Sequence, residues 1–316
     1  MSKVSVIVPI YNSSKYLREC LDSIVNQTLD DIEIIAIDDC SSDNSYDILL
    51  EYASKYKNIK AFRTIKNIGV GAVRNMGIEL STSNYIGFVD GDDSICPNMY
   101  EAMYIGAINN NNPDVISCGI RFIYDDNMNL VNYDYLRKGI LTNLINNPLQ
   151  VYWESPSCCN KMFKKELIGD YRFLEDSSFE DIAFTYSLLF KSNNILDIPD
   201  NYYLYRKNIN NSKSMLNFKP NDKIYDIFNV CDELDRQVLN SGNYIHYAKV
   251  LPLLQQVVCL QRLNEIKNWD MNDIRKKDFM KKFYDIICLK YGDLSKSDIA
   301  LLSARSDISL IEKQVK

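Results

Sequence analysis

The stretch YIGFVDGDD, residues 85–93, constrains the fold more than any other part of this sequence. It begins as an apolar run of strand-forming residues and ends in three carboxylates around one glycine, Asp90, Gly91, Asp92 and Asp93. Strand propensity explains the first half, but packing does not explain three acids within four residues, because they repel one another without a cation. Mg²⁺ and Mn²⁺ prefer carboxylate oxygens. The stretch therefore predicts a metal–phosphate site at the carboxyl edge of a sheet, with a solvated polar turn as the alternative.

Two earlier segments have the same character. Residues 4–10 (VSVIVPI) and 32–37 (IEIIAI) are nearly continuous β-branched runs, which are typical of strands buried on both faces of a parallel sheet. The second run is followed by Asp38 and Asp39, then by small hydroxyl residues and an amphipathic helical pattern. A third strand is expected at residues 59–64, before a glycine-containing loop that enters a helix. Strands that alternate with helices, with acids at the strand ends, predict a doubly wound α/β layer that binds a ligand at its carboxyl edge.

Composition excludes several classes of function. The net charge of −6 over 316 residues argues against a nucleic-acid partner held by phosphate contacts. The single histidine, His246, excludes a His-rich zinc site and argues against a Ser-His-Asp triad. Nine cysteines without a CxxC pair indicate reduced thiols and a cytoplasmic location. Neither a signal peptide nor a membrane-spanning run is expected from the sequence.

Six short strings carry a resemblance to a known family. They are VSVIVPIYN, IDDCSSDNS, GVGAVRNMGI, YIGFVDGDD, FED at residues 179–181, and YR at residues 205–206 followed by two serines. In their order and spacing the chain resembles the family 2 glycosyltransferases of bacterial surface-polysaccharide synthesis. The resemblance implies the GT-A fold, a Rossmann-like α/β architecture with a mixed, mostly parallel sheet flanked by helices. It covers residues 1–215, expected to form the nucleotide-sugar and acceptor catalytic domain, and residues 216–316 are expected to form a helical C-terminal extension.

The resemblance implies a donor site built from the first three strings. Pro9 and Tyr11 would lie under the nucleoside, and Asp39 would accept a hydrogen bond from the base, for which uracil N3–H is the natural donor. Asp38 would be a structural or ribose-side acid. Arg74 would face the base or the diphosphate. The expected donor is therefore a nucleotide-sugar, with UDP as the expected nucleotide.

The resemblance also assigns roles to the acidic stretch. Asp92 would bind a divalent metal, Mn²⁺ or Mg²⁺, and Asp90, one residue before Gly91, would hold the ribose or a metal-bound water. Asp93 would support this shell. Arg206 would contact the diphosphate at the start of a loop that closes on it. A cation that bridges two phosphates lowers the barrier, since the leaving nucleoside diphosphate gains negative charge.

A second acidic pair, Glu180 and Asp181, is predicted to open a helix. The resemblance makes Asp181 the catalytic base, which takes the proton of the acceptor hydroxyl, and lets Glu180 shape the acceptor pocket. The alternative is that two acids in a first helical turn only favour the helix dipole. Lys161 is interpreted either as a phosphate contact or as a solvated surface lysine. Residues 195–198 and 202–206 are expected to form two strands.

From residue 222 onward the sequence predicts helices, with Gly242 ending the first. Residues 271–290 alternate lysine and arginine with phenylalanine and isoleucine. Such a basic amphipathic helix either lies on an anionic membrane or packs as an ordinary surface helix. Peripheral membrane contact and a homodimer are left open.

The resemblance therefore implies an inverting hexosyl- or N-acetylhexosaminyltransferase in the cytoplasm, with contact at the inner face of the plasma membrane left open. Its acceptor would be a hydroxyl of a glycan or a lipid-linked glycan. One alternative is a sugar-1-phosphate nucleotidyltransferase, although the glycine-rich basic loop expected after its first strand is missing. The other alternative is a non-catalytic subunit that binds a sugar nucleotide.

Overall fold

The computed structural model describes residues 2–124, 130–133, 139–207, 222–267, 269 and 272–292. The chain divides into two compact units, Met1–Lys207 and Asn208–Lys316. The domain boundary expected after residue 215 falls outside the described residues.

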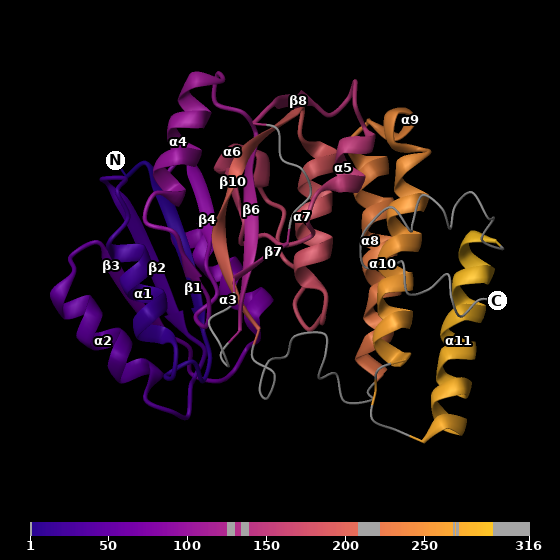
Figure 1. Ribbon diagram of the computed structural model, residues 1–316, viewed down its shortest axis with the longest axis horizontal. Coiled ribbons are helices and arrows are strands. Elements are labelled where there is room, and N and C mark those ends of the chain that lie inside the picture. Colours follow the sequence, from indigo (N-terminus) through magenta and orange to yellow (C-terminus); the bar gives the residue numbers. More distant parts are fainter. Residues whose placement is uncertain are drawn as a thin grey trace. The chain divides into compact units, whose positions relative to one another are not determined.

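The described residues of the first unit form one sheet of ten strands, in the order β3-β2-β1-β4-β9-β6-β10-β5, with β7 paired to β6 and β8 to β10. Most of these strands are labelled in Figure 1. Strands β1 to β4 are parallel to one another, as are β6 and β10, whereas β9 is antiparallel to both neighbours, β4 and β6. The sheet is therefore mixed, as predicted. The strands are β1 (Val4–Ile10), β2 (Ile32–Asp38), β3 (Ile59–Arg63), β4 (Tyr85–Phe88), β5 (Ser94–Ile95), β6 (Val115–Tyr124), β7 (Leu130–Tyr133), β8 (Leu141–Asn143), β9 (Lys161–Lys164) and β10 (Asn194–Lys207).

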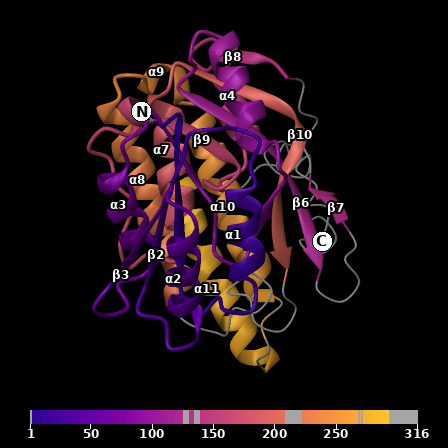
Figure 2. The ribbon, with the colours of Figure 1, turned by 90° about the vertical axis from the view of Figure 1, so that its left-hand side faces the viewer.

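Every residue of β1 and β2 is buried, which explains their continuous apolar sequence. Helices flank these strands (Figure 2), and α3 packs directly on β1. A Cβ atom on Gly77 of α3 would lie 2.4 Å from the side chain of Ile7, so this close approach requires glycine. The helices are α1 (Leu17–Val25), α2 (Ser45–Lys55), α3 (Val70–Leu80), α4 (Met99–Asn109), α5 (Leu149–Trp153), α6 (Lys165–Ile168) and α7 (Glu180–Lys191).

The expectation of two strands at residues 195–198 and 202–206 is wrong, because both belong to β10. The pairing of β10 with β6 is interrupted between Asp197 and Asn201. Pro199 lies in this interruption and is exposed. A bulge lets a strand continue past a proline, which cannot donate to the sheet.

The second unit is helical, as predicted. It contains a 3₁₀ turn, Asp222–Tyr225, and the helices α8 (Asp226–Asn240), α9 (Tyr244–Tyr247), α10 (Val250–Lys267) and α11 (Asp273–Tyr291). Gly242 follows α8 with a φ of 73°, which confirms the predicted helix end. Along the described residues, no helix combines the length and apolar character needed to cross a bilayer. None of the nine cysteines, all of which lie among the described residues, forms a disulfide in the structure.

Candidate functional site

The parallel pairing of β1, β2 and β4 brings their carboxyl ends to one edge of the sheet. Ile10 at the end of β1 pairs with Asp38 at the end of β2, and Ile7 pairs with Phe88 at the end of β4. The segments that follow these strands therefore meet at this edge, as the sequence predicted. They contain Tyr11, Asp39 and the acid turn, which is the name used here for residues 90–93.

The acid turn has one carboxylate that faces solvent and one that is buried. Asp92 is exposed, whereas Asp93 is almost fully buried. The Asp93 carboxylate accepts hydrogen bonds from Tyr203 Oη (2.5 Å) and from the backbone N–H of Arg206 (2.7 Å). Burial raises the pKa of Asp93 well above its usual range, and the charges of Asp92 and Asp90 add to the effect, against the two hydrogen bonds. Asp93 thus anchors the turn to β10 and leaves Asp92 at the surface.

The turn rests on the corner that follows β1. A Cβ atom on Gly91 would lie 3.1 Å from the carbonyl oxygen of Pro9 and 3.3 Å from Ser13 Oγ. Pro9 itself is buried, whereas Tyr11 is 45% exposed. Of the two residues expected under a nucleoside, Tyr11 is therefore the one that can offer its ring to a ligand.

Asp39 holds the loop that enters α3. Its carboxylate accepts hydrogen bonds from Thr64 Oγ1 (2.9 Å) and from the backbone N–H groups of Ile68 (2.8 Å) and Gly69 (2.9 Å). A carboxylate has about four lone-pair positions, so these three bonds leave about one for a ligand. The structure therefore gives Asp39 a loop-ordering role that the sequence did not reveal.

Asp38 is fully buried and has structural partners. Its Oδ2 accepts a hydrogen bond from the backbone N–H of Ser41 (3.1 Å) and lies 3.2 Å from Nε of Arg63. The carboxylate has no exposed surface with which to meet a ribose. Of the two roles expected for Asp38, structural or ribose-side, this placement fits the structural one.

Arg74 lies elsewhere than expected, because its side chain is buried between two carboxylates. Nη1 donates to Glu180 Oε1 (2.8 Å), and Nη2 donates to Asp90 Oδ1 (2.7 Å). Only 5% of the side chain is exposed. Both terminal nitrogens are thus turned to protein acids rather than outward toward a base or a diphosphate. The guanidinium joins the acid turn to the first turn of α7.

Helix α7 begins at Glu180, as predicted, and presents Asp181 in its first turn. Asp181 is partly exposed, and its Oδ1 accepts a hydrogen bond from the backbone N–H of Ile182 (2.8 Å). The segment before α7 is clamped to α3, since Asn75 bonds to both the N–H (2.8 Å) and the carbonyl (3.0 Å) of Phe173. The second acidic pair is therefore fixed relative to the acid turn through α3.

Arg206, at the end of β10, is also held by protein groups. Its Nη2 lies 2.6 Å from Oε1 of Glu19, its Nε donates to the carbonyl of Asp92 (3.1 Å), and its guanidinium stacks 4.6 Å from the Tyr16 ring. Glu19 and Tyr16 were not predicted to lie at this site, because neither an acid on a helix surface nor a tyrosine at a helix start marks a binding site in the sequence. The loop expected to close after Arg206 lies outside the described residues.

Both interpretations of Lys161 are wrong. The side chain is fully buried, and Nζ donates to the carbonyls of Ser155 (2.8 Å) and Ser157 (3.0 Å) and to Oδ1 of Asn160 (3.0 Å). The lysine therefore orders the loop before β9 instead of meeting phosphate or solvent.

The described residues contain no cluster of three or more histidine, cysteine or acidic side chains arranged around a metal position. A Mg²⁺ or Mn²⁺ ion commonly uses only one or two protein carboxylates and completes its shell with phosphate oxygens and water. Exposed Asp92 and the partly exposed Asp90 fit an ion that arrives with a diphosphate. They do not fit a metal held by the protein alone.

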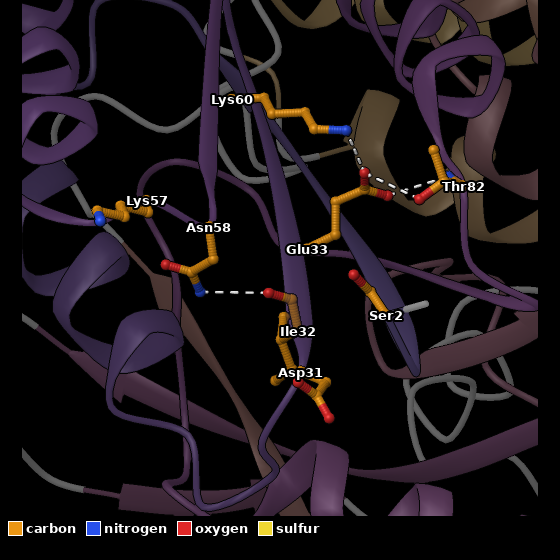
Figure 3. A pocket seen from close by; sticks show the side chains of 8 residues that line it. All are labelled: Ser2, Asp31, Ile32, Glu33, Lys57, Asn58, Lys60 and Thr82. Atoms are coloured by element: carbon orange, nitrogen blue, oxygen red, sulfur yellow. Dashed lines mark hydrogen bonds and ion pairs between the residues drawn. The ribbon is translucent and has the colours of Figure 1, made fainter.

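A polar hollow at the opposite, amino-terminal edge of the sheet is distinct from this site (Figure 3). It contains Glu33, whose carboxylate already bonds to Lys60 Nζ (2.5 Å), Ser5 Oγ (2.5 Å) and the backbone N–H of Thr82 (3.0 Å). Burial opposes ionisation, but these hydrogen bonds outweigh it and lower the pKa of Glu33. The acid is therefore saturated by the protein, and the hollow is a structural feature.

Comparison with known proteins identifies related sequences. The family model described as "Glycosyl transferase family 2" matches residues 5–172. The chain is 32% identical to "Glycosyltransferase GlyG" of Streptococcus pneumoniae serotype 4 over 214 residues, 65% of this chain and 70% of that protein. It is 49% identical to "Poly(ribitol-phosphate) beta-glucosyltransferase" of Bacillus spizizenii over 96 residues, 29% of this chain but only 15% of that protein.

Among solved structures, the chain is similar to residues 1–349 of S. aureus TarS, crystallised in complex with UDP-GlcNAc. The TM-score is 0.60 at 24% identity, and the match covers 84% of this chain and 79% of that one. The similarity shows that the two chains share a fold, with the mixed sheet and flanking helices described above.

Proposed function

Because the chain belongs to glycosyl transferase family 2, we propose that it transfers a sugar, with inversion, from a UDP-sugar to a hydroxyl of a glycan or lipid-linked glycan. One observation carries this proposal: Arg74 joins the acid turn, with its exposed Asp92, to the acidic first turn of α7. This link supports a single site that combines a carboxylate suited to a metal–diphosphate with one suited to proton transfer. Nothing in the comparisons favours the nucleotidyltransferase or the non-catalytic alternative.

In this proposal the donor lies along the carboxyl edge of β1, β2 and β4. Tyr11 offers its ring to the nucleoside, and Asp39 offers its remaining acceptor position to the base. Asp92 and the oxygen of Asp90 not bound to Arg74 would hold a divalent ion, which stabilises the charge that develops on the diphosphate. In this proposal Arg206 would contact the diphosphate only after part of its ion pair with Glu19 is broken.

Asp181 is proposed as the general base. Its carboxylate takes the proton of the acceptor hydroxyl while the acceptor oxygen bonds to the anomeric carbon and the bond to the diphosphate breaks. Attack from the side opposite the leaving group inverts that carbon, and no covalent intermediate is needed. Glu180 accepts from Arg74 through Oε1, so its role is to hold this arrangement.

The test of this assignment is Asp181→Asn. The first assay is release of UDP from the UDP-sugar that the wild type hydrolyses in a screen of candidate donors, and the second is UDP affinity. We expect turnover to fall by about 10²–10⁴-fold, the usual contribution of a positioned base, while UDP affinity stays within about twofold. Asp170→Asn is the matched control, because Asp170 is an exposed acid before the same helix. Unchanged turnover in Asp181→Asn would remove the base from this residue.

We propose a bacterial surface polymer as the acceptor, in keeping with the name of the B. spizizenii relative, a poly(ribitol-phosphate) beta-glucosyltransferase. The free thiols support the reducing, cytoplasmic compartment predicted from the sequence. Peripheral membrane contact stays a prediction. Arg275, Lys277 and Lys281 of α11 are exposed, but Asp278 and Asp285 are exposed on the same helix. Binding to anionic liposomes at low salt tests this contact, and sedimentation tests the homodimer.

A further inference from the structure

The guanidinium of Arg74 contacts two acids that are 90 residues apart in the chain. We propose that Arg74 is a positioning residue that fixes the carboxylates of Asp90 and Glu180 relative to each other. One side chain would then set the geometry of both the donor side and the acceptor side. The inference rests on the proposed function only in that the terms donor side and acceptor side are taken from it.

The geometry favours one arrangement of the guanidinium. Its two terminal nitrogens donate at 2.7 Å and 2.8 Å to two different acids, and its carbon lies 5.3 Å from the centroid of the Phe173 ring. A planar guanidinium group that donates to two acids and lies against an aromatic ring has little freedom to rotate. A lysine at this position would keep the charge, but one ammonium group does not reproduce this planar group.

Two other residues of α3, Gly71 and Asn75, also hold the segment that leads into α7. A Cβ atom on Gly71 would lie 2.6 Å from the carbonyl oxygen of Leu174, and Asn75 clamps Phe173 through two hydrogen bonds. Positions 71, 74 and 75 lie on one face of the helix, because they are three and four residues apart. This face therefore holds both the segment that leads into α7 and the guanidinium that reaches its first residue.

Opposite charges stabilise the link that Arg74 forms between Asp90 and Glu180. Glu180 is 8% exposed and Arg74 is 4% exposed, so removal of the arginine leaves a buried carboxylate without a counter-charge. The same link predicts communication in both directions. Loss of the Asp90 carboxylate loosens the hold on Glu180, and loss of the Glu180 carboxylate loosens the hold on Asp90.

The first experiment needs no ligand. Amide hydrogen exchange is measured in the wild type, Asp90→Ala and Glu180→Ala. We expect Asp90→Ala to speed exchange in residues 181–184, and Glu180→Ala to speed exchange in residues 90–93. Each change should be about threefold or more, the range of coupling within one ion-pair network. Asp90→Asn and Glu180→Gln replace the alanine variants if those do not fold.

The matched control is Arg172→Met. Arg172 donates through Nε to Glu79 of α3 (2.9 Å), so it joins the same helix to the same segment, but at the exposed surface. This variant should leave exchange in residues 90–93 unchanged. If Asp90→Ala and Glu180→Ala each alter exchange only around their own position, the inference is overturned.

The second experiment measures UDP affinity by calorimetry with Mn²⁺. Glu180→Ala should weaken UDP binding by about threefold or more in the wild type, and should have no further effect in an Arg74→Met background. Arg74→Lys should restore part of the affinity that Arg74→Met loses. Equal effects of Glu180→Ala in both backgrounds would contradict the inference. If the wild type binds no UDP, the proposed function fails, and the exchange experiment alone decides on Arg74.

Discussion

Gly71 provides a sharp test of how α3 positions the acceptor side, because helix propensity and packing predict opposite results there. Within a helix, Gly→Ala stabilises by about 1 kcal/mol when the new methyl group has space. At Gly71 the new Cβ would lie 2.6 Å from the backbone oxygen of Leu174, whereas ordinary contact begins at 3.4 Å. The segment before α7 must therefore move by 0.8 Å, the difference of these distances.

The magnitude follows from these two opposing terms. Overpacking costs about 1–3 kcal/mol, so Gly71→Ala should lower the free energy of unfolding by about 0–2 kcal/mol after the gain in helix propensity. The effect on turnover should be larger than the effect on stability. A displacement close to 1 Å at a reacting group can cost about 100-fold, so we expect a loss of roughly 10–100-fold in UDP release from the UDP-sugar that the wild type hydrolyses.

Gly106→Ala in α4 is the matched control. Its Cβ would meet only the flexible side-chain ends of Ile198 (2.9 Å) and Leu196 (3.1 Å). Urea unfolding and UDP release are measured for both variants. If Gly71→Ala is as stable and as active as Gly106→Ala, then α3 does not position the segment before α7.

Two further predictions concern buried charges. Lys161→Met should lower the free energy of unfolding by on the order of 3 kcal/mol, because it leaves the carbonyls of Ser155 and Ser157 without the hydrogen bonds that Lys161 donates. Urea unfolding measures this change, and a value below about 0.5 kcal/mol would contradict the prediction. Burial raises the pKa of Glu265 in α10 from 4.5 to about 7, against the opposing charge of Arg262. The folded helix therefore favours the protonated acid, and this stabilisation is complete below about pH 4.5 and lost as the pH rises through about 7. The loss should be about 3 kcal/mol, visible as lower amide protection factors in α10 once the intrinsic pH dependence of exchange is removed, and Glu265→Gln should abolish this loss.

The strands and the acidic clusters could be predicted because their signals are local. The continuous apolar runs of β1 and β2 reflect burial on both faces, and the acids that follow them mark the carboxyl edge. The start of α7 at Glu180 was predictable for the same reason, since two acids suit a first helical turn.

The partners of the basic residues could not be predicted, because they depend on which distant segments the topology brings together. Arg74 meets Glu180 across 106 positions, and Lys161 is enclosed by a loop whose conformation no local pattern encodes. Arg206 was expected to be available to a ligand, but Glu19 of α1 lies within 2.6 Å of it. In each case the charged residue in the sequence gave no information about the groups that would bind it.

The bulge in β10 is a further example. The sequence predicted two strands, residues 195–198 and 202–206, but both belong to one strand. No local pattern shows that the pairing with β6 resumes beyond the interruption between Asp197 and Asn201.

The most direct test of the proposed function is calorimetric titration of UDP, GDP, dTDP and CDP, each with and without Mn²⁺, on the wild type and on Asp92→Ala. The proposal predicts that UDP binds, that binding requires Mn²⁺, and that Asp92→Ala loses the metal-dependent part. Glu166→Ala serves as a control, because Glu166 is an exposed acid on α6. Binding of none of the four nucleotides, or UDP binding that is indifferent to both Mn²⁺ and Asp92, would contradict a metal–diphosphate site at the acid turn.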